Sequence, residues 1–269
     1  MDDNKRAHYR YVYHHTPCFH ILTSGIGASL ARIYLSQSKD HNLVAVARTK
    51  DSLDQLAAEF GSRVVVVSGD VTDPEVSARA VREAISHFGV INSVVANAGV
   101  LDPVDTVAKA DVSRWRRLYD INFFSVVDLV AAALPHLEKS HGRIVAVSSG
   151  ACEKPYFGWC AYGSSKAALN HLMMSVAEEN PNVGAISVAP GVVATSMQED
   201  IREKFGANMT PESLQRFVDL HTNGKLSPPE LPATVYTNLA VRGWTKEMNG
   251  KYFRVGDSAL KTYEDSDSA

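Results

Sequence analysis

Tyr162 and Lys166 lie four residues apart, and Ser148 and Ser149 come shortly before them. Residues at this spacing share one face of a helix, so the Lys166 ammonium would lie beside the Tyr162 phenol. A free phenol, with a pKa of about 10, is a poor acid or base at neutral pH, but a neighbouring cation favours phenolate and lowers this pKa. The pair could then deliver a proton to a substrate oxygen. Taken alone, the five residues from Tyr162 to Lys166 fit an ordinary helix surface better.

The pattern from Cys18 onward predicts the elements that would position these residues. Short apolar runs alternate with helical stretches, which is typical of βαβ units. Most runs are continuous and rich in β-branched residues, as in strands covered on both faces. We therefore predict one α/β domain, a Rossmann-type doubly wound parallel sheet with helices on both faces. The predicted strands are 19–22, 43–47, 64–67, 93–96, 143–147 and 185–188, with 252–255 last, and the predicted helices are 28–37, 52–60, 74–88, 112–134 and 161–179.

Ligands of such a sheet bind beyond the carboxyl ends of its strands. Glycines directly after the carboxyl end of the first strand would let the pyrophosphate of a dinucleotide approach the backbone and the helix N-terminus. A tight turn without a ligand is the alternative. The residues of this glycine turn are Thr23, Ser24, Gly25, Ile26 and Gly27.

The later strand exits add polar residues at the same edge. Arg48 follows the second strand, where an acidic residue would bind an unmodified ribose and an arginine suits a 2′-phosphate, so NADP is favoured over NAD. The alternative for Arg48 is a solvated loop. Small residues that follow the third and fourth strands are each common in turns. Because they lie at the same edge of the sheet as the glycine turn, together they indicate a cofactor cleft. They are Asp70, Val71, Asn97, Ala98 and Gly99.

Composition excludes several other classes. The 269 residues carry a formal charge of −3 and no long basic cluster, so we expect neither nucleic acid nor an anionic membrane as a partner. The most apolar helical run, 126–134, is interrupted by Asp128 and expected to end at Pro135, far short of a bilayer span. A soluble protein is predicted.

Cysteine and histidine placement predicts no metal site. Cys18, Cys152 and Cys160 form no C-x-x-C pair and are odd in number, so we expect free thiols in a reducing, cytoplasmic compartment. Residues 1–17 form a polar head without the apolar core of a secretory signal. The adjacent His14 and His15 indicate a loosely ordered tail, not a ligand pair.

The ordered set of motifs resembles the short-chain dehydrogenase/reductase family, from about Ser24 to near Val255. Ser149 lies thirteen residues and Asn122 forty residues before Tyr162, which fits the family's spacing. In the family's order the motifs are the glycine turn, Asp70-Val71, Asn97-Ala98-Gly99, Asn122, Ser149, Tyr162 with Lys166, and Pro190-Gly191 followed by Thr195.

The resemblance implies a catalytic role for four residues. Tyr162 would protonate a carbonyl oxygen as hydride arrives from the nicotinamide, and Lys166 would lower the phenol pKa and hold the nicotinamide ribose. Ser149 would donate a hydrogen bond to the substrate oxygen. Asn122 would hold a water behind Lys166, or tie a helix to a neighbouring strand. The resemblance also implies cofactor contacts for Pro190, Gly191, Val193 and Thr195, beside those of the strand exits.

The glycine turn departs from the family pattern Thr-Gly-x-x-x-Gly-x-Gly, because Gly25 follows Thr23 by only two positions. If the strand slides to restore the loop length, His20 takes the threonine position and Ile21 the first glycine position. A β-branched residue tolerates positive φ badly. One hypothesis is that the head, through about Thr23, lies outside the working protein through a misassigned start or exon boundary, which sequencing the 5′ end of the transcript tests.

Substrate choice is expected in a lid at about 195–225, with helices at 196–207 and 210–221, the second capped by Thr210. Apolar residues of this segment either wall a pocket or pack the lid on the domain, while Tyr156 and Trp159 are better candidates for touching substrate. In residues 45–48 and in its short C-terminal tail the chain is similar to fungal benzil-reductase-like and sepiapterin-reductase-like members. The lid residues in question are Met197, Phe205, Met209, Leu214 and Phe217.

Two functions remain open from sequence. The first is an NADPH-dependent reductase of a small ketone, aldehyde or diketone, acting as a homodimer or homotetramer through helices 112–134 and 161–179. The second is a catalytically silent dinucleotide-fold binding protein, disabled by its shortened glycine turn. NADPH titration separates the two.

Overall fold

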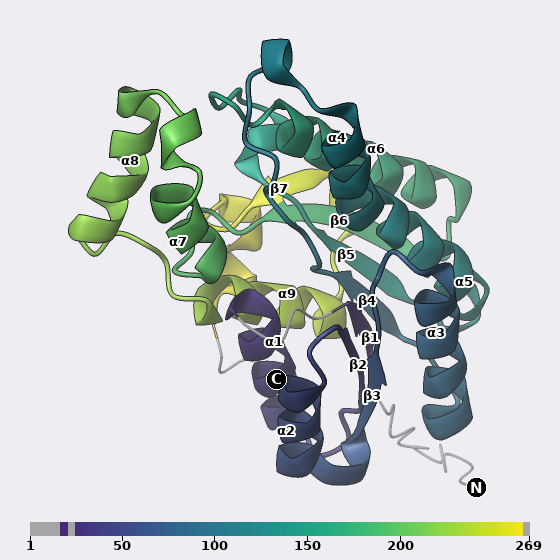
Figure 1. Cartoon of the computed structure of the whole chain (residues 1–269). Coiled ribbons are helices and arrows are strands. Elements are labelled where there is room, and N and C mark those ends of the chain that lie inside the picture. Colours follow the sequence, from purple (N-terminus) through teal and green to yellow (C-terminus); the bar gives the residue numbers. More distant parts are fainter. Residues whose placement is uncertain (1–16, 21–24, 266–269) are drawn as a thin grey trace, which may run out of the picture.

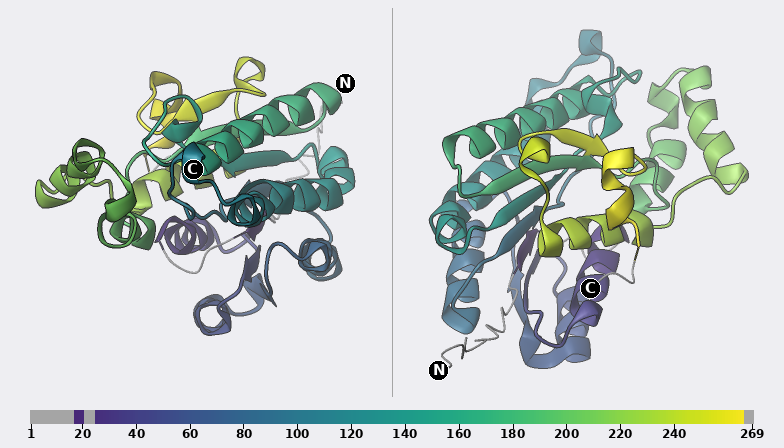
Figure 2. Two further views of the ribbon diagram at one scale, coloured as in Figure 1. Left: turned by 45° about the horizontal axis from the view of Figure 1, so that its top comes forward. Right: turned by 180° about the vertical axis from the view of Figure 1, so that it is seen from behind.

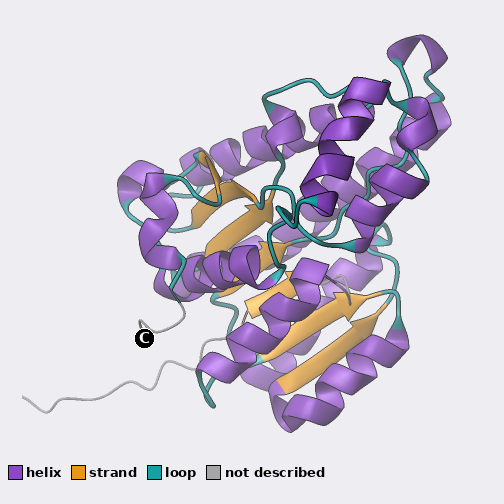
Figure 3. Ribbon diagram, turned by 90° about the vertical axis from the view of Figure 1, so that its left-hand side faces the viewer, coloured by secondary structure: helices purple, strands orange, loops and turns teal. Residues whose placement is uncertain are grey.

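The computed structural model describes residues 17–20 and 25–265, and its centre is a seven-stranded sheet of parallel strands. The strand order is β3-β2-β1-β4-β5-β6-β7, so the connections reverse direction between β1 and β4 (Figure 1). Seen from the side, the sheet lies between helices (Figure 3). The predicted doubly wound sheet is confirmed. The strands are β1 Pro17–His20, β2 Leu43–Ala47, β3 Val64–Ser68, β4 Ser93–Ala96, β5 Arg143–Val147, β6 Gly184–Ala189 and β7 Tyr252–Arg254.

Helices cover both faces of this sheet, as its uninterrupted apolar strands require (Figure 2). Alternation along β2 shows the two layers: Val44 and Val46 pack on one side, and Leu43 and Ala45 on the other. One layer is formed by α1 Gly25–Gln37, α2 Lys50–Phe60 and α9 Glu230–Arg242, and the other by α3 Pro74–Phe88, α5 Ser125–Ser140 and α6 Cys160–Glu179.

Helix α9 is missing from the sequence prediction. It is buried on nearly all sides, since every residue from Pro232 to Ala240 is buried. A helix covered all round has no apolar stripe at a 3.6-residue period, and Pro232 stands in its first turn, so periodicity does not reveal it. Its packing against α1 completes one layer of the core.

The long helix of the other layer extends further than predicted. α4 Val112–Tyr119, a π-helical turn at Asp120–Phe124 and α5 form one helical stretch, Val112–Ser140, which continues through Pro135. Pro135 is exposed, so water can bond the carbonyl that lacks its usual N–H partner. The prediction that the helix ends at this proline is therefore wrong.

By length and composition alone, the 29-residue stretch Val112–Ser140 could cross a membrane; 39% of its most apolar window is buried inside the protein. Core helices of globular domains have the same properties. Leu129, Ala133 and Leu137 of α5 are fully buried in the core cluster on the sheet. The stretch is therefore weak grounds for membrane insertion.

Strand β1 ends at His20, two residues before the predicted end, with Cys18 opposite Val44 and His20 opposite Ala96. A two-residue shift keeps each residue on the same face of the sheet, so the apolar pattern could not fix the register. Four residues then separate β1 from Gly25. This loop length matches the second alignment, in which His20 takes the threonine position and Ile21 the first glycine position. Thr23 and Ser24, like residues 1–16 of the head, lie outside the described residues. The other strands match their predicted bounds to within one residue at each end.

Residues 195–225 project from the carboxyl edge of the sheet as α7 Ser196–Glu203, a 3-10 turn at Gly206–Asn208 and α8 Pro211–Thr222 (Figure 1). The Thr210 hydroxyl accepts a hydrogen bond from the backbone N–H of Ser213, as the predicted N-cap requires. This helical pair stands beside the end of the sheet where the strand exits gather.

Candidate active site

Helix α6 holds Tyr162 and Lys166 side by side in its first two turns. Both side chains are buried, with 7% and 3% of their surfaces exposed. The Lys166 Nζ atom donates to the carbonyl of Val147 at the end of β5, at 2.7 Å, and lies 5.9 Å from the Tyr162 ring centre. The i,i+4 spacing thus places an amine and a phenol together at the carboxyl edge of the sheet.

The electrostatics of the pair differ from the sequence expectation. Burial raises the pKa of the Tyr162 phenol above its usual value, and a hydrogen bond with Ser149 only partly offsets this. Burial also lowers the pKa of Lys166 to about 8. The predicted lowering of the Tyr162 pKa by its neighbour is therefore wrong for this arrangement, because desolvation is the largest influence on the phenol. At neutral pH the phenol keeps its proton.

The two adjacent serines point to different partners. The Ser148 hydroxyl donates to Oδ1 of Asn170 at 2.7 Å and is buried. The Ser149 Oγ atom accepts from the Ala151 N–H at 3.2 Å and also bonds the Tyr162 phenol. Ser149 therefore shares the tyrosine's environment, while Ser148 ties β5 to α6.

Asn122 occupies the π-helical turn between α4 and α5 and is fully buried. Its Oδ1 accepts from the Val100 N–H at 2.8 Å, and its Nδ2 donates to the Val100 carbonyl at 2.9 Å and to Ser165 Oγ at 3.2 Å. These bonds are those of an amide that ties a helix to the loop after a strand. A Cβ at Gly99 would lie 3.4 Å from Lys166 Nζ and 3.5 Å from Asn122 Oδ1, so the amide stands close behind the lysine.

The described part of the glycine turn opens α1. Gly25 has φ of +58°, and a Cβ there would lie 2.9 Å from the Thr195 side chain. Both positive φ and close approach thus require glycine at this position. Gly27 is buried in the first turn of α1. The first turn of α1 therefore meets the start of α7 at the strand edge.

Of the remaining predicted cofactor residues, some line the cavity described below and some do not. Arg48 is exposed after β2 and outside the cavity. Val71 and Ala98 are packed in the core, so only their backbone could contact a ligand. The predicted residues that line the cavity are Gly25, Ile26, Asn97, Gly99, Ser149, Tyr162, Lys166, Pro190, Gly191, Val193 and Thr195.

Asp70 makes contacts within the protein that its motif did not reveal. Burial alone would raise its pKa, but hydrogen bonds from Thr72 and Arg117 outweigh this and lower the pKa to about 2. The Arg117 guanidinium reaches the carboxylate at 2.7 Å from α4. Asp70 therefore joins the β3 exit to α4 as an ionised group.

A cavity of about 200 Å³ connects these residues to the 195–225 segment. One wall is aromatic: Trp159 stacks on Tyr156 with ring centres 4.9 Å apart and on Phe217 at 5.4 Å, and its edge meets Tyr162 at 5.8 Å. Arg216 of α8 lies over the Tyr156 ring at 5.4 Å. The wall suits a flat apolar group next to the phenol.

The apolar residues predicted to wall a pocket separate into two groups. Met197 and Phe217 line the cavity. Phe205 and Met209 are buried in the cluster beneath it, and Leu214 packs against that cluster, so these three hold the 195–225 segment on the domain.

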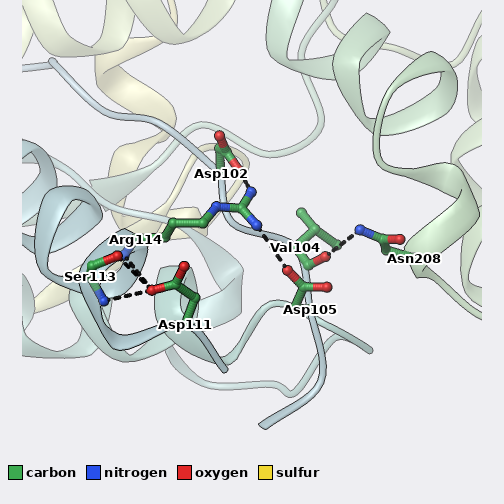
Figure 4. Close-up of polar contacts among 7 residues, drawn as sticks. All are labelled: Asp102, Val104, Asp105, Asp111, Ser113, Arg114 and Asn208. Atoms are coloured by element: carbon green, nitrogen blue, oxygen red, sulfur yellow. Dashed lines mark hydrogen bonds and ion pairs between the residues drawn. The ribbon is translucent and has the colours of Figure 1, made fainter. Parts of the chain in front are cut away.

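The loop between β4 and α4 anchors the 195–225 segment at the rim (Figure 4). The Arg114 guanidinium bridges two loop carboxylates, pairing with Asp102 and lying 3.3 Å from Asp105. Between these, the Val104 carbonyl accepts a hydrogen bond from Asn208 Nδ2 at 2.9 Å. The ion pairs therefore fix a loop that in turn holds the turn after α7.

Sequence reasoning missed Gln198, Ile201, Arg216 and Arg254 among the cavity residues. None belongs to a motif. Arg254 ends β7, and only the pairing of Ala189 with Arg254 brings it to the edge where β5 ends. A basic residue after the last strand carries no signal of its own.

The sequence model of the short chain dehydrogenase family matches residues 22–206. The chain belongs to this family. It is an oxidoreductase of the short-chain dehydrogenase type, as the ordered motifs predicted, and the nicotinamide dinucleotides NAD and NADP are the cofactors of the family. Its described sheet and flanking helices are those of the family fold.

Three similar proteins place the chain within this family. It is 43% identical over 246 residues to benzil reductase ((S)-benzoin forming) IRC24 of Saccharomyces cerevisiae, across 88% of this chain and 94% of that protein. The crystal structure of YIR035C from the same yeast superposes with a TM-score of 0.92 at 44% identity, covering 93% of this chain and 100% of that one. The KRED1-Pglu enzyme gives a TM-score of 0.87 at 47% identity, with 88% and 99% covered. The predicted resemblance to fungal benzil-reductase-like members is confirmed.

Proposed function

We propose that this short-chain dehydrogenase is an NADPH-dependent carbonyl reductase that acts on a small ketone, aldehyde or diketone carrying an aromatic group. The observation that carries the proposal is a buried, protonated Tyr162 phenol, bonded to Ser149 and beside Lys166, in the wall of a cavity at the carboxyl edge of a parallel sheet.

The residues around the cavity fit a nicotinamide dinucleotide. Gly25 and Gly191 have positive φ, and no atom lies within 4 Å of a Cβ added at Gly191, so the backbone is open to a ligand there. The first turn of α1 with Thr195 would hold the pyrophosphate, and Pro190, Gly191 and Val193 would contact the carboxamide. When bound, the cofactor supplies a hydride to the carbonyl carbon.

The chain's own residues would then handle the oxygen. Tyr162, whose phenol is protonated at neutral pH, donates its proton to the carbonyl oxygen. Ser149 donates a hydrogen bond to the same oxygen and so stabilises the charge that develops on it. Lys166, bonded to Val147, presents its other N–H groups to the ribose, and Asn122 holds a water behind it.

Two observations support an aromatic substrate. The stacked rings of Tyr156, Trp159 and Phe217 offer a flat apolar wall beside the phenol. The 43% identical yeast relative is named for benzil, a diketone with two phenyl groups. We propose residues 195–225 as the lid that closes over this substrate.

A substrate screen tests the activity. The full-length chain is assayed with aromatic aldehydes, ketones and diketones, with NADPH and NADH in parallel. Tyr162→Phe should lower kcat by about 10²- to 10⁴-fold, the range that general acid catalysis contributes. Tyr119→Phe, at a partly buried position of α4 outside the cavity, is the matched control. Equal kcat values for Tyr162→Phe and the parent would refute the assignment.

The preference for NADP rests on Arg48. Its guanidinium is exposed at the β2 exit and makes no hydrogen bond or ion pair within the described residues, so it is available to a 2′-phosphate. Arg48→Ala should lower the ratio of kcat/KM for NADPH over NADH by about tenfold or more. Lys50→Ala, two positions further on at the start of α2 and paired with Asp54, is the control.

The glycine turn favours a second candidate, a binding protein without catalysis. In the alignment that restores the loop length, Ile21 takes the first glycine position, and a β-branched residue tolerates positive φ badly. Titration with NADPH, followed by its fluorescence, separates the candidates: no binding at millimolar NADPH would leave the catalytic set unused. Replacing Ile21 with glycine would then test whether this residue is the cause. The hypothesis that the head through Thr23 lies outside the working protein has its own test in the transcript's 5′ end.

Assembly and location complete the proposal. The helical stretch 112–140 exposes the large apolar side chain of Phe124, in its π-helical turn, and α6 exposes that of Met174. Each is 52% exposed, which supports a homodimer or homotetramer through these two helical segments. Light scattering on the purified chain measures the state. The free thiols of Cys152 and Cys160 support a reducing, cytoplasmic location, which a fluorescent fusion tests.

A further inference from the structure

Arg254 covers the backbone next to Ser149. Its side chain lines the cavity, and a Cβ at Gly150 would lie only 2.1 Å from Arg254 Nη2. Consecutive Cα atoms are about 3.8 Å apart, so the guanidinium stands about one residue away from the serine that the mechanism uses. Glycine at position 150 is what allows this approach.

The guanidinium of Arg254 is open to a ligand. Among the described residues, its nearest carboxylate, Glu153, lies 4.0 Å away, too far for a hydrogen bond, and the Asp257 carboxylate accepts from the backbone N–H of Arg254, not from its guanidinium. Within residues 25–265 no Asp or Glu lines the cavity. A cation with unused donors in a cavity without acidic groups is suited to an oxygen acceptor of the substrate.

The other arginine of the cavity is already engaged. Arg216 lies over the rings of Tyr156 and Phe217, at 5.4 and 5.9 Å, and its Nη1 is 3.4 Å from the Tyr156 hydroxyl. It therefore extends the aromatic wall. Of the two arginines, Arg254 is the one that stands with Lys166 at the reacting end of the cavity.

We propose that Arg254 binds a second oxygen of the substrate, on the carbon next to the carbonyl that is reduced. This inference rests on the proposed function, because Ser149 and Tyr162 must hold the first oxygen. An aryl group then lies on the aromatic wall, the reacting oxygen at the phenol and the neighbouring oxygen at the guanidinium. The preferred substrates are aryl 1,2-dicarbonyl compounds, whose second oxygen belongs to a 2-oxo acid or to a 1,2-diketone.

The test compares three substrates on the full-length chain with NADPH: phenylglyoxylate, 1-phenylpropane-1,2-dione and 1-phenylpropan-1-one, which lacks the second oxygen. The measured quantity is kcat/KM for each dicarbonyl divided by that for the monoketone. Dicarbonyls are intrinsically more reactive, but this factor cancels when the ratio is compared between variants. Arg254→Met should lower the ratio by about tenfold or more for at least one dicarbonyl, since charge-assisted hydrogen bonds have this strength.

The two dicarbonyl arms identify the source of the second oxygen. A larger fall with phenylglyoxylate indicates a carboxylate, and a larger fall with the dione indicates a neutral carbonyl. Arg254→Lys should fall between parent and Arg254→Met, because it keeps the charge but loses the fork. Arg82→Met, on the exposed face of α3, should leave both ratios unchanged.

A second variant approaches the same contact from the backbone. The methyl group of Gly150→Ala would occupy the position 2.1 Å from Arg254 Nη2 and push the flexible guanidinium away, so the ratios should fall as in Arg254→Met. If Arg254→Met does not fold, the ratios of kcat/KM are compared between the parent, Gly150→Ala and Arg254→Lys instead. Unchanged ratios in the folded variants overturn the inference alone. A parent chain that reduces neither these three compounds nor any aldehyde, ketone or diketone of the screen overturns the proposed function as well.

Discussion

Gly163→Ala is expected to increase the distance between the Tyr162 phenol and the Ser149 hydroxyl without changing either residue. Gly163 follows Tyr162 on α6, and a Cβ there would lie 2.6 Å from the backbone carbonyl oxygen of Ala151, two residues after Ser149. Ordinary contact begins at about 3.4 Å, so α6 and the turn after β5 must move apart by about 0.8 Å. The obstacle is backbone and cannot rotate away, so the shift falls on the distance between the phenol and the serine.

The magnitude follows from this displacement. Misplacement of reacting groups by about 1 Å can lower the rate about a hundredfold, so kcat/KM should fall by about ten- to a hundredfold. Stability should change less: overpacking costs about 1–3 kcal/mol, while alanine gains about 1 kcal/mol over glycine within a helix. The expected net loss is about 0–2 kcal/mol, a few degrees in Tm.

The assay is steady-state reduction with NADPH beside thermal unfolding of the same samples. Ser164→Ala is the matched control, because the Ser164 hydroxyl bonds only the Cys160 and Ala161 carbonyls of its own helix. It should keep parental kcat/KM. A folded Gly163→Ala protein with parental kcat/KM would refute the reasoning, since the close approach of α6 to Ala151 would then not set the geometry.

Three further predictions follow from named contacts. Because the pKa of Lys166 is lowered to about 8, the ammonium that would hold the ribose is lost as pH rises through about 8, and kcat/KM for NADPH should fall there; a flat profile from pH 7 to 9 contradicts this. Arg114→Ala should raise KM more than it lowers kcat, with a stability loss of about 1 kcal/mol or less because its ion pairs are exposed and screened, and 1 M salt should move the parent's KM toward the variant's. Asn122→Ala removes three buried hydrogen bonds, including both to Val100, and should lower the free energy of unfolding by about 2–4 kcal/mol in denaturant titration; a loss under about 0.5 kcal/mol would show that the amide does not hold the turn.

The sequence by itself determined the features that local pattern encodes. Continuous β-branched runs marked strands such as Leu43–Ala47 and Arg143–Val147, since a strand covered on both faces must be apolar at every position. The spacing of Tyr162 and Lys166 determined that they share a helix face, and Thr210-Pro211 opened α8 as cap and first-turn residue. These signals lie within a few residues of the structure that they specify.

Only the tertiary structure decided the rest. α9 is covered on all sides and so has no periodic signal, and β1 could shift by two residues without changing which face each residue occupies. The direction of the Tyr162 pKa shift depended on burial of the phenol, which the spacing to Lys166 does not reveal. Arg254 reaches Gly150 only because β7 pairs with β6 and β6 with β5. Each of these outcomes depends on residues far apart in the chain, whose distances no local spacing encodes.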